Sequence, residues 1–306
     1  MKTYLATLGK IVTIVFLLFL LSPVYTLYSQ APGESGLSVK WDELTAPDFI
    51  KAVELSGKTC IIPLGIMEKH GAHLPLGSDL IIAREIATRA AEKEYCLVFP
   101  PYYVGQIFEA MHQPGTVAYS NELIWNMLQE TCDELHRNGI DKIILVNGHG
   151  SNNSFLPFFC QSQLAAKKAY AVIFFQPETD EKTMQEVAKL KKTGPDMHAG
   201  EEESSMIYTI RPDLVYTERA ASQSGGDRAR LSVPYGYTGI WWYARFPNHY
   251  AGDGSHVDKR IGELLLESRS GQLVELIRYL KDNDDIIELQ NRFYKEASSP
   301  LNTEQR

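Results

Sequence analysis

The chain has 306 residues, of which 44% are hydrophobic and 22% are charged, and its formal net charge is −8. This composition is that of a globular protein and argues against a chain that is disordered throughout. The negative charge argues against a nucleic-acid groove or an anionic membrane surface as the main partner, because both attract basic proteins.

Residues 1–30 differ in character from the rest of the chain. Lys2 and Lys10 precede an uncharged apolar run that ends in a stretch containing serine and proline. A basic start followed by a short hydrophobic centre is typical of a secretory signal peptide, so we expect export to the periplasm or the medium. The alternative is an uncleaved membrane anchor, since residues at the end of the run, such as Tyr28, are not the small ones that favour cleavage.

From residue 58 onward, short β-branched segments alternate with segments of helical periodicity. Strands are predicted at 59–65, 96–101, 141–148 and 170–176. Helices are predicted at 80–95, 121–139, 153–169 and 259–282. Strands that alternate with helices predict an α/β protein, with helices on both faces of a mainly parallel sheet in a three-layer α/β/α arrangement.

We expect residues 31–306 to form a single domain, because no linker rich in proline, glycine and serine divides the chain after residue 40. Residues 217–257 are predicted to be a long irregular segment near the functional face. The helix at 121–139 has the clearest start, since Ser120 can cap it.

The four cysteines are Cys60, Cys96, Cys132 and Cys160. None belongs to a Cys-x-x-Cys pair, so a zinc–thiolate site is not expected. Export would permit disulfides, but a chain of this size does not need them. We therefore expect buried free thiols.

The loop after the first predicted strand concentrates ionisable side chains. Glu68 and His70 are two residues apart, and in an extended chain they point the same way. Asp79 follows at the start of the next helix. A carboxylate pair with an imidazole suits Zn²⁺, Mn²⁺ or Fe²⁺. The alternative is that Asp79 caps the helix while Glu68 and His70 form a surface pair.

Two further loops carry candidate side chains. His149 follows the third predicted strand inside a turn flanked by glycines, and the alternative is a purely structural turn. His198 and Glu201 are three residues apart, and they would share a face if a helix began near Ala199. The alternative for this third segment is an acidic first turn that stabilises the helix start without any function.

Loops that follow parallel strands open on one edge of the sheet, where ligands gather in such folds. The loop at 65–79 follows the first strand and the loop at 147–152 follows the third. We therefore expect both to open onto the same crevice.

Together the three segments resemble the creatininase family of metal-dependent amidohydrolases, over about residues 40–270. The blocks of that family are Glu-x-His-Gly-x-His-Leu-Pro followed by an aspartate, then Asn-Gly-His-Gly-x-Asn, then His-Ala-Gly-Glu-x-Glu-(Thr or Ser)-Ser. They stand here as residues 68–75 with Asp79, 147–152 and 198–205. The resemblance implies the creatininase-like α/β/α fold and a homo-oligomer, in that family a hexamer.

The resemblance also implies a centre with two divalent metal ions, zinc or manganese, with iron as an alternative. Carried over by position, Glu68 and His149 hold one ion. His70 holds the other, and Asp79 bridges the two.

For the remaining candidate residues, the family pattern and this sequence differ or the role is not that of a ligand. Creatininase itself has a metal-binding glutamate two residues after the histidine of Asn-Gly-His, where this chain has Ser151. We expect Glu201 to replace it, turned toward His198 by helical spacing, while Glu203 is the alternative ligand or orients a ligand. His198 falls where the family has a histidine proposed to shuttle protons. His73 is expected to be structural or to support a ligand.

The implied reaction is hydrolysis of a non-peptide C–N bond in a small amide, such as a cyclic amide or a formamide. Water activated by the ions would attack the carbonyl carbon, and His198 would protonate the departing nitrogen. Creatinine itself is disfavoured, because Gly150-Ser151 replaces the Tyr-Glu pair of creatininase and Gly194 replaces its tryptophan.

Alternatives stay open at this point. A lactonase or a deaminase could use the same activated water, and a relative without activity could keep the metal site. Trp241 and Trp242 could wall the substrate pocket or belong to ordinary core packing.

Overall fold

Residues 36–305 are described by the computed structural model, and the predicted signal peptide lies outside them. Within this range, no helix combines the length and the apolar character that crossing a membrane requires. The chain from Leu37 onward forms one compact unit.

A parallel sheet lies at the centre of this unit. Among the described residues, four strands pair in the order β2-β1-β3-β4. The strands are β1 (Thr59–Leu64), β2 (Leu97–Val98), β3 (Lys142–Asn147) and β4 (Ala171–Phe175). Leu64 and Asn147, the last residues of β1 and β3, lie opposite each other. The loops that follow these two strands therefore leave the sheet side by side.

Helices account for most of the remaining regular structure. The α-helices are α2 (Ala46–Leu55), α3 (Ser78–Lys93), α4 (Asn121–Arg137), α5 (Asn152–Ser162), α6 (Glu181–Leu190), α7 (Glu201–Ile210), α8 (Trp241–Arg245), α9 (Lys259–Asp282) and α10 (Asp285–Ala297). The short 3-10 helices are η2 (Trp41–Glu43), η3 (Phe108–Ala110), η4 (Gln163–Ala165), η5 (Pro212–Leu214), η6 (Thr217–Ser222) and η7 (Pro300–Asn302).

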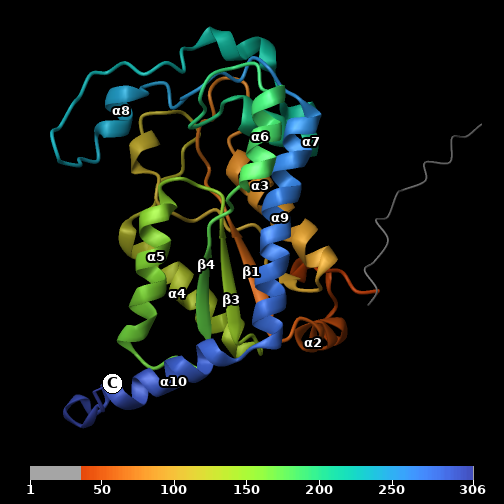
Figure 1. The fold of residues 1–306 in the computed structure, drawn as a ribbon, viewed down its shortest axis with the longest axis vertical. Helices are drawn as coiled ribbons and strands as arrows, with labels where there is room; N and C mark the ends of the chain where they lie inside the picture. Colours follow the sequence, from red (N-terminus) through yellow and green to blue (C-terminus); the bar gives the residue numbers. More distant parts are fainter. Residues whose placement is uncertain (1–35, 306) are drawn as a thin grey trace, which may run out of the picture. The chain divides into compact units, whose positions relative to one another are not determined.

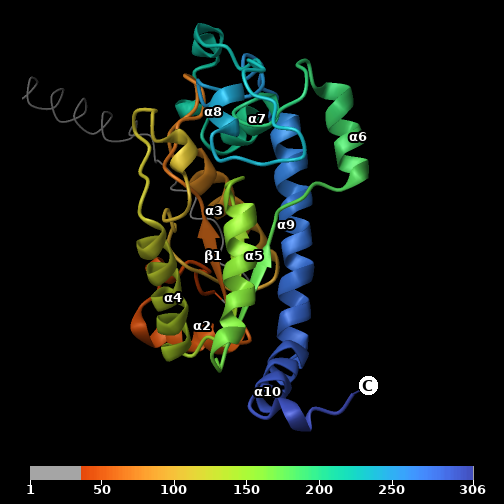
Figure 2. The ribbon, with the colours of Figure 1, turned by 90° about the vertical axis from the view of Figure 1, so that its left-hand side faces the viewer.

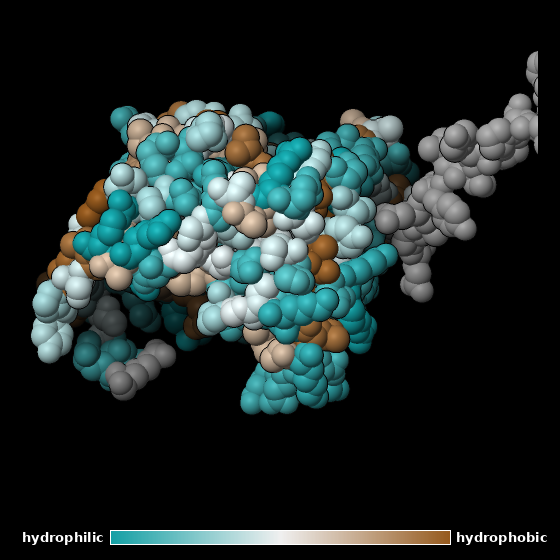
Figure 3. Space-filling model, turned by 90° about the horizontal axis from the view of Figure 1, so that it is seen from above, coloured by the Kyte–Doolittle hydropathy of each residue, from teal (hydrophilic) through white to brown (hydrophobic). Residues whose placement is uncertain are grey.

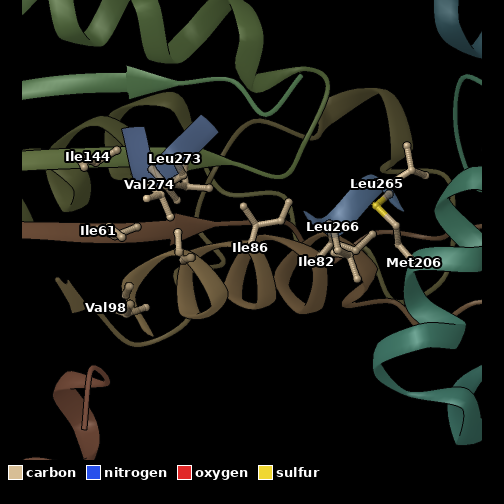
Figure 4. Packing of buried hydrophobic residues seen from close by; sticks show 14 of the residues in the cluster. Ile61, Ile82, Ile86, Val98, Ile144, Met206, Leu265, Leu266, Leu273 and Val274 are labelled. Carbon is tan, nitrogen blue, oxygen red and sulfur yellow. The ribbon is translucent and has the colours of Figure 1, made fainter. Parts of the chain in front are cut away.

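One face of the sheet is covered by α3 and α9. Ile61 of β1 and Ile144 of β3 lie in one buried hydrophobic cluster. Ile86 of α3 and Leu273 of α9 pack in the same cluster, as Figure 4 shows. Farther along, α9 packs against α7, so this long helix joins the sheet to the segment that carries His198.

The opposite face is covered by α4 and α5. Because side chains alternate along a strand, Ile62 and Leu145 point away from the first cluster and into a second one. Leu128 of α4 and Phe159 of α5 complete that second cluster. Both ribbon views place α4 and α5 across the sheet from α9 (Figures 1 and 2). The expected three-layer α/β/α fold with a parallel sheet is confirmed.

The predicted elements differ from the structure mainly at their ends. The second strand is only two residues long, because the prolines at 100 and 101 lack the N–H groups that would continue the ladder. The helix predicted at 153–169 ends at Ser162 and continues as a 3-10 turn. Ser120 caps α4 as expected, since its hydroxyl accepts a hydrogen bond from the Leu123 nitrogen at 3.2 Å.

All four cysteines lie within the described residues and are free, as expected. Cys60, Cys96 and Cys132 are buried, and Cys160 is half-buried. Burial raises the pKa of the Cys96 thiol to about 12. These thiols are therefore protonated core groups rather than nucleophiles.

Residues 217–257 are largely irregular, with η6 and α8 as their regular parts. They lie with α7 at one end of the unit, above the sheet in Figures 1 and 2. Viewed from above, that end exposes mainly hydrophilic and neutral residues, with hydrophobic ones scattered among them (Figure 3).

Candidate metal centre

Two glycines bring the start of α3 against the ends of β1 and β3. A Cβ atom at Gly65 would overlap the backbone of Asp79 and Leu80, and one at Gly148 would lie 2.7 Å from the Asp79 carbonyl oxygen. Only glycine permits so close an approach. Asp79 is thereby placed between the loop after β1 and the loop after β3.

Asp79 does not cap α3, which begins one residue earlier. Its carboxylate lies between two histidines instead. Oδ1 is 3.0 Å from Nε2 of His70, and Oδ2 is 3.1 Å from Nδ1 of His149. All three side chains are buried. Asp79 therefore connects the two loops, in the position that a bridging ligand requires.

Glu68 completes the group around His149. Its Oε1 atom is 2.7 Å from Nδ1 of His149, and the side chain is buried. The surface pair of Glu68 and His70, which was the alternative to a metal site, does not form, because both side chains are buried and His70 turns toward Asp79. Nδ1 of His70 lies 3.2 Å from the Glu68 carbonyl oxygen, so its N–H donates there, and Nε2 is directed toward Asp79.

Glu203 lies on the other side of His70. Its Oε1 atom is 3.6 Å from Nε2 of His70, and its Oε2 accepts a hydrogen bond from the Ala199 nitrogen at 2.5 Å. The structure therefore brings Glu203, the residue ranked second from the sequence, to the cluster.

Glu201, the ligand favoured from the sequence, is not brought to the cluster. Its buried carboxylate accepts hydrogen bonds from the backbone nitrogens of Lys192 and Thr193 at 2.9 and 2.7 Å. The reason is the helix start: α7 begins at Glu201, and Ala199 has a φ of +57°. His198 therefore lies outside the helix, and its helical spacing to Glu201 does not apply. Within α7, positions 201 and 203 point in different directions.

His198 lies beside the cluster. Its ring centroid is 4.3 Å from that of His70, and Nε2 is 2.9 Å from the Lys69 carbonyl oxygen. Nε2–H therefore donates to that carbonyl, and Nδ1 carries the free lone pair, 4.0 Å from Oε2 of Glu203. Burial lowers the pKa of His198, which favours its neutral form.

His73 supports the site from outside. Its Nε2 atom lies 3.1 Å from the Ala199 carbonyl oxygen and 3.0 Å from Oγ of Ser204. The ring therefore ties the loop after β1 to the start of α7. The structural or supporting role expected for His73 from the sequence stays a prediction.

The cluster balances buried charges of opposite sign. Burial alone would raise the pKa of Asp79, but His70 and His149 outweigh it and hold that pKa well below its ordinary value. Burial alone would lower the pKa of His70, yet the Glu203 and Asp79 carboxylates raise it. Glu68 is left with a pKa raised by burial. Carboxylates this deeply buried need positive charge nearby, which divalent cations supply.

The residues present fit two such cations. Ligand atoms lie within 4.8 Å of one another in three groups: Glu68, Asp79 and His149; His70, Asp79 and Glu203; and Glu68, His70 and His198. Oε1 of Glu68 and Oδ2 of Asp79 are buried and both approach Nδ1 of His149. Neither oxygen makes a hydrogen bond of good geometry with that atom or with another described residue. Carboxylate oxygens and imidazole nitrogens are ligands that Zn²⁺ and Mn²⁺ accept.

Two residues near the cluster were not predicted. His249, in the irregular segment, is buried and hydrogen-bonded to Oε2 of Glu68. Glu109, on η3, accepts a hydrogen bond from Oγ of Ser151, and its Oε1 is 4.0 Å from Nε2 of His149. Glu109 follows β2, whose end opens on the same sheet edge, so the loop after that strand was the signal that could have revealed it. No sequence motif marks His249.

Comparison with known proteins identifies the family of this chain. The family model described as creatininase, creatinine amidohydrolase, matches residues 42–277. A creatinine amidohydrolase of Pseudomonas putida is 26% identical over 196 residues, which cover 60% of this chain and 75% of that protein. A mycofactocin precursor peptide peptidase of Mycobacterium ulcerans (strain Agy99) is 31% identical over 185 residues, which cover 56% of this chain and 66% of the peptidase.

The fold is shared with solved structures. A variant creatininase of Zn–Zn type superposes with a TM-score of 0.67 at 23% sequence identity, covering 79% of this chain and 98% of that one. The family model spans most of the chain and includes the residues that form the cluster. The chain therefore belongs to the creatininase family of amidohydrolases.

Proposed function

We propose that this protein is a metal-dependent amidohydrolase that cleaves a non-peptide C–N bond of a small amide with the help of two divalent ions. The observation that carries the proposal is the shared carboxylate of Asp79. Its two oxygens face His70 and His149, and each histidine has a further carboxylate beside it. This is the donor set of a dinuclear centre.

The ligands divide into two groups with Asp79 in common. Glu68 and His149 would hold one ion, and His70 and Glu203 would hold the other. Zinc and manganese are the metals we propose, and the related variant creatininase of Zn–Zn type supports zinc. When bound, two such ions lower the pKa of a water molecule and stabilise negative charge that develops on a carbonyl oxygen.

His198 is the residue we assign to proton transfer. The Lys69 carbonyl holds the Nε2 proton, so Nδ1 is the atom that takes up a proton from the attacking water. The same atom then returns the proton to the departing nitrogen, because an amine leaves poorly as an anion.

Trp242 lies next to this histidine. Its ring meets the His198 ring edge-on, with centroids 5.9 Å apart. We propose that this ring borders the substrate, where an aromatic surface would suit a small planar amide, such as a cyclic amide or a formamide. Ser151 and Gly194 depart from creatininase, so creatinine itself is not the substrate we propose. The two relatives named above are a creatinine amidohydrolase and a mycofactocin precursor peptide peptidase. Their names indicate different substrates, so the family fold alone does not fix the substrate.

Metal analysis and a substrate screen test the proposal. We expect purified protein to carry two zinc or manganese ions per chain, and Asp79→Asn to lose both. Cyclic amides, formamides, lactones, amidines and short peptides are then screened with each metal. Metal-dependent release of an amine or a carboxylate from an amide supports the proposal. Turnover of lactones alone, or deamination alone, would assign one of the alternative reactions, and absence of bound metal would contradict the amidohydrolase.

We propose export from the pattern of residues 1–30 and assembly into a homo-oligomer from the family resemblance. N-terminal sequencing of protein from the periplasm or medium tests cleavage of the proposed signal peptide. Light scattering after gel filtration tests the proposed hexamer. A protein that stays with the membrane fraction would favour an uncleaved anchor instead.

A further inference from the structure

Two side chains, Trp242 and His249, form a chain of hydrogen bonds that ends at Glu68. His249 is 2% exposed, and its Nε2 atom is hydrogen-bonded to Oε2 of Glu68. On the other edge of the same ring, Nε1–H of Trp242 donates to Nδ1 of His249 at 2.9 Å. Three residues from two distant parts of the sequence are thus linked in the order Trp242, His249, Glu68.

The tautomer of His249 follows from this order. An indole nitrogen can only donate, so the atom that faces it, Nδ1, must carry the lone pair. The ring proton therefore sits on Nε2, and it points at Oε2 of Glu68. Oε2 is committed to this hydrogen bond, while Oε1 remains directed toward Nδ1 of His149 at 2.7 Å.

The same argument shows that His249 is not itself a ligand of the ion. Binding through Nε2 would require the proton to move to Nδ1. Two N–H groups, those of His249 and Trp242, would then face each other at 2.9 Å. That arrangement leaves both donors unsatisfied in a buried place, which costs about 1–3 kcal/mol for each group.

The backbone conformation of His249 and its hydrogen bonds hold the ring in this position. His249 has a φ of +50°, a conformation that residues other than glycine seldom adopt. Its N–H donates to the Phe246 carbonyl at 3.0 Å, and its carbonyl accepts from the Gly71 nitrogen at 3.4 Å. The second contact joins this segment to the loop that carries Glu68.

We propose that Trp242 and His249 are positioning residues that fix the Glu68 carboxylate so that one oxygen is presented to the metal ion. This inference rests on the proposed function, because it assumes that Glu68 binds an ion. It adds that the irregular segment at 217–257 takes part in metal binding without supplying a ligand. Trp242 then has two tasks, since the same ring also borders His198.

Zinc affinity of the full-length protein, measured by competition with a chromophoric chelator, tests the inference. Residues that orient metal ligands typically contribute about 10–100-fold to metal affinity. We expect His249→Ala to weaken one of the two sites by about that factor. His249→Gln should retain most of the affinity, because its amide N–H can reach Glu68. Trp242→Phe should weaken the same site less, and Trp241→Phe, the matched control, should not change it.

A second readout needs no metal. In metal-free protein labelled with ¹⁵N-histidine, long-range ¹H–¹⁵N correlation should report His249 protonated on Nε2. In Trp242→Phe, the two tautomers should both be populated. Circular dichroism verifies that each variant is folded, and Trp242→Phe and His249→Gln decide the question if His249→Ala does not fold.

The outcomes separate the two proposals. If wild-type protein binds two zinc ions and every folded variant binds them as tightly, the positioning role is wrong while the metal centre stands. A His249 protonated on Nδ1 would also overturn the role. If wild-type protein binds neither zinc nor manganese, the dinuclear centre fails, and the positioning role fails with it.

Discussion

Glu203 lies with its Oε1 atom 3.6 Å from Nε2 of His70, whereas Glu201, two residues earlier, points its carboxylate at the backbone of Lys192 and Thr193. Two acids of one helical turn thus have different tasks. Glu203 belongs to the candidate metal centre, and Glu201 accepts hydrogen bonds from the backbone of the segment that precedes α7.

The first prediction separates these tasks. Glu203→Gln should lose one of two metal ions, because an amide oxygen is a weaker ligand than a carboxylate. Glu201→Gln should keep both ions but unfold more easily, by about 1 kcal/mol, since backbone N–H groups would lose a charged acceptor. Elemental analysis after gel filtration and urea unfolding check the two halves. Loss of an ion from Glu201→Gln alone would reverse the assignment.

Glu109 gives a second prediction. Its side chain is 11% exposed, and it faces Nε2 of His149, which has no hydrogen-bond partner among the described residues. When Nδ1 binds an ion, Nε2 carries the proton, and a carboxylate nearby makes the imidazole a stronger ligand. We expect Glu109→Gln to lower zinc affinity several-fold by chelator competition. Glu130→Gln, an exposed acid on α4, is the control. Equal affinities for both variants would contradict the prediction.

The third prediction concerns pH and His73. Burial lowers the pKa of His73 to about 4, against 6.5 for the ordinary side chain. Between these values the unfolded chain binds more protons than the folded one, so stability is highest above pH 6.5 and decreases as pH falls toward 4. The full effect is on the order of 3 kcal/mol.

Urea unfolding at several pH values, with a chelator present to remove metal, measures this dependence. His73→Gln cannot titrate, so its free energy of unfolding should fall less steeply than that of wild-type protein over the same range. Parallel curves for the two proteins would show that another group is responsible.

The fourth prediction assigns His198 to chemistry rather than to binding. His198→Asn should keep both metal ions, and turnover of the amide found in the screen should fall by about 10²–10⁴-fold. His256→Asn, an exposed histidine, should leave turnover unchanged. If His198→Asn loses an ion instead, His198 is a ligand in the group with Glu68 and His70.

The fifth prediction tests the layer that supports the site. Leu273 of α9 is fully buried, whereas Leu289 of α10 is 59% exposed. Leu273→Ala should lower the free energy of unfolding by about 2–5 kcal/mol, because it removes buried methyl groups and leaves a cavity. Leu289→Ala, the same change at the surface, should lower it by less than about 1 kcal/mol. Similar losses at both positions would contradict the packing described here.

Features set by local sequence were predictable. The helix at 259–282 has the same limits in the structure, since its apolar residues repeat at helical spacing. Ser120 caps α4 because a cap depends on its immediate neighbours. The meeting of Asp79 with His149 was also predictable, as both follow or flank strands that end at one sheet edge.

Features set by tertiary contacts could not be predicted from the sequence. The choice of Glu203 over Glu201 depends on where α7 begins, and Ala199, in a left-handed conformation, delays that start. His249 reaches Glu68 only because the irregular segment folds back onto the loop after β1. Neither event has a periodic or motif signal in the sequence.

The close approach of Gly65 and Gly148 to the first turn of α3 has a practical consequence for protein engineering. The separation between the groups that would hold the ions is set by the main chain, through positions that tolerate no side chain. Residues of the irregular segment 217–257 other than Trp242 and His249 can therefore be redesigned to accept new substrates while the spacing at Asp79 is left alone. Gly65 and Gly148 should stay fixed in any such library, because altering either one would displace the helix and the carboxylate together.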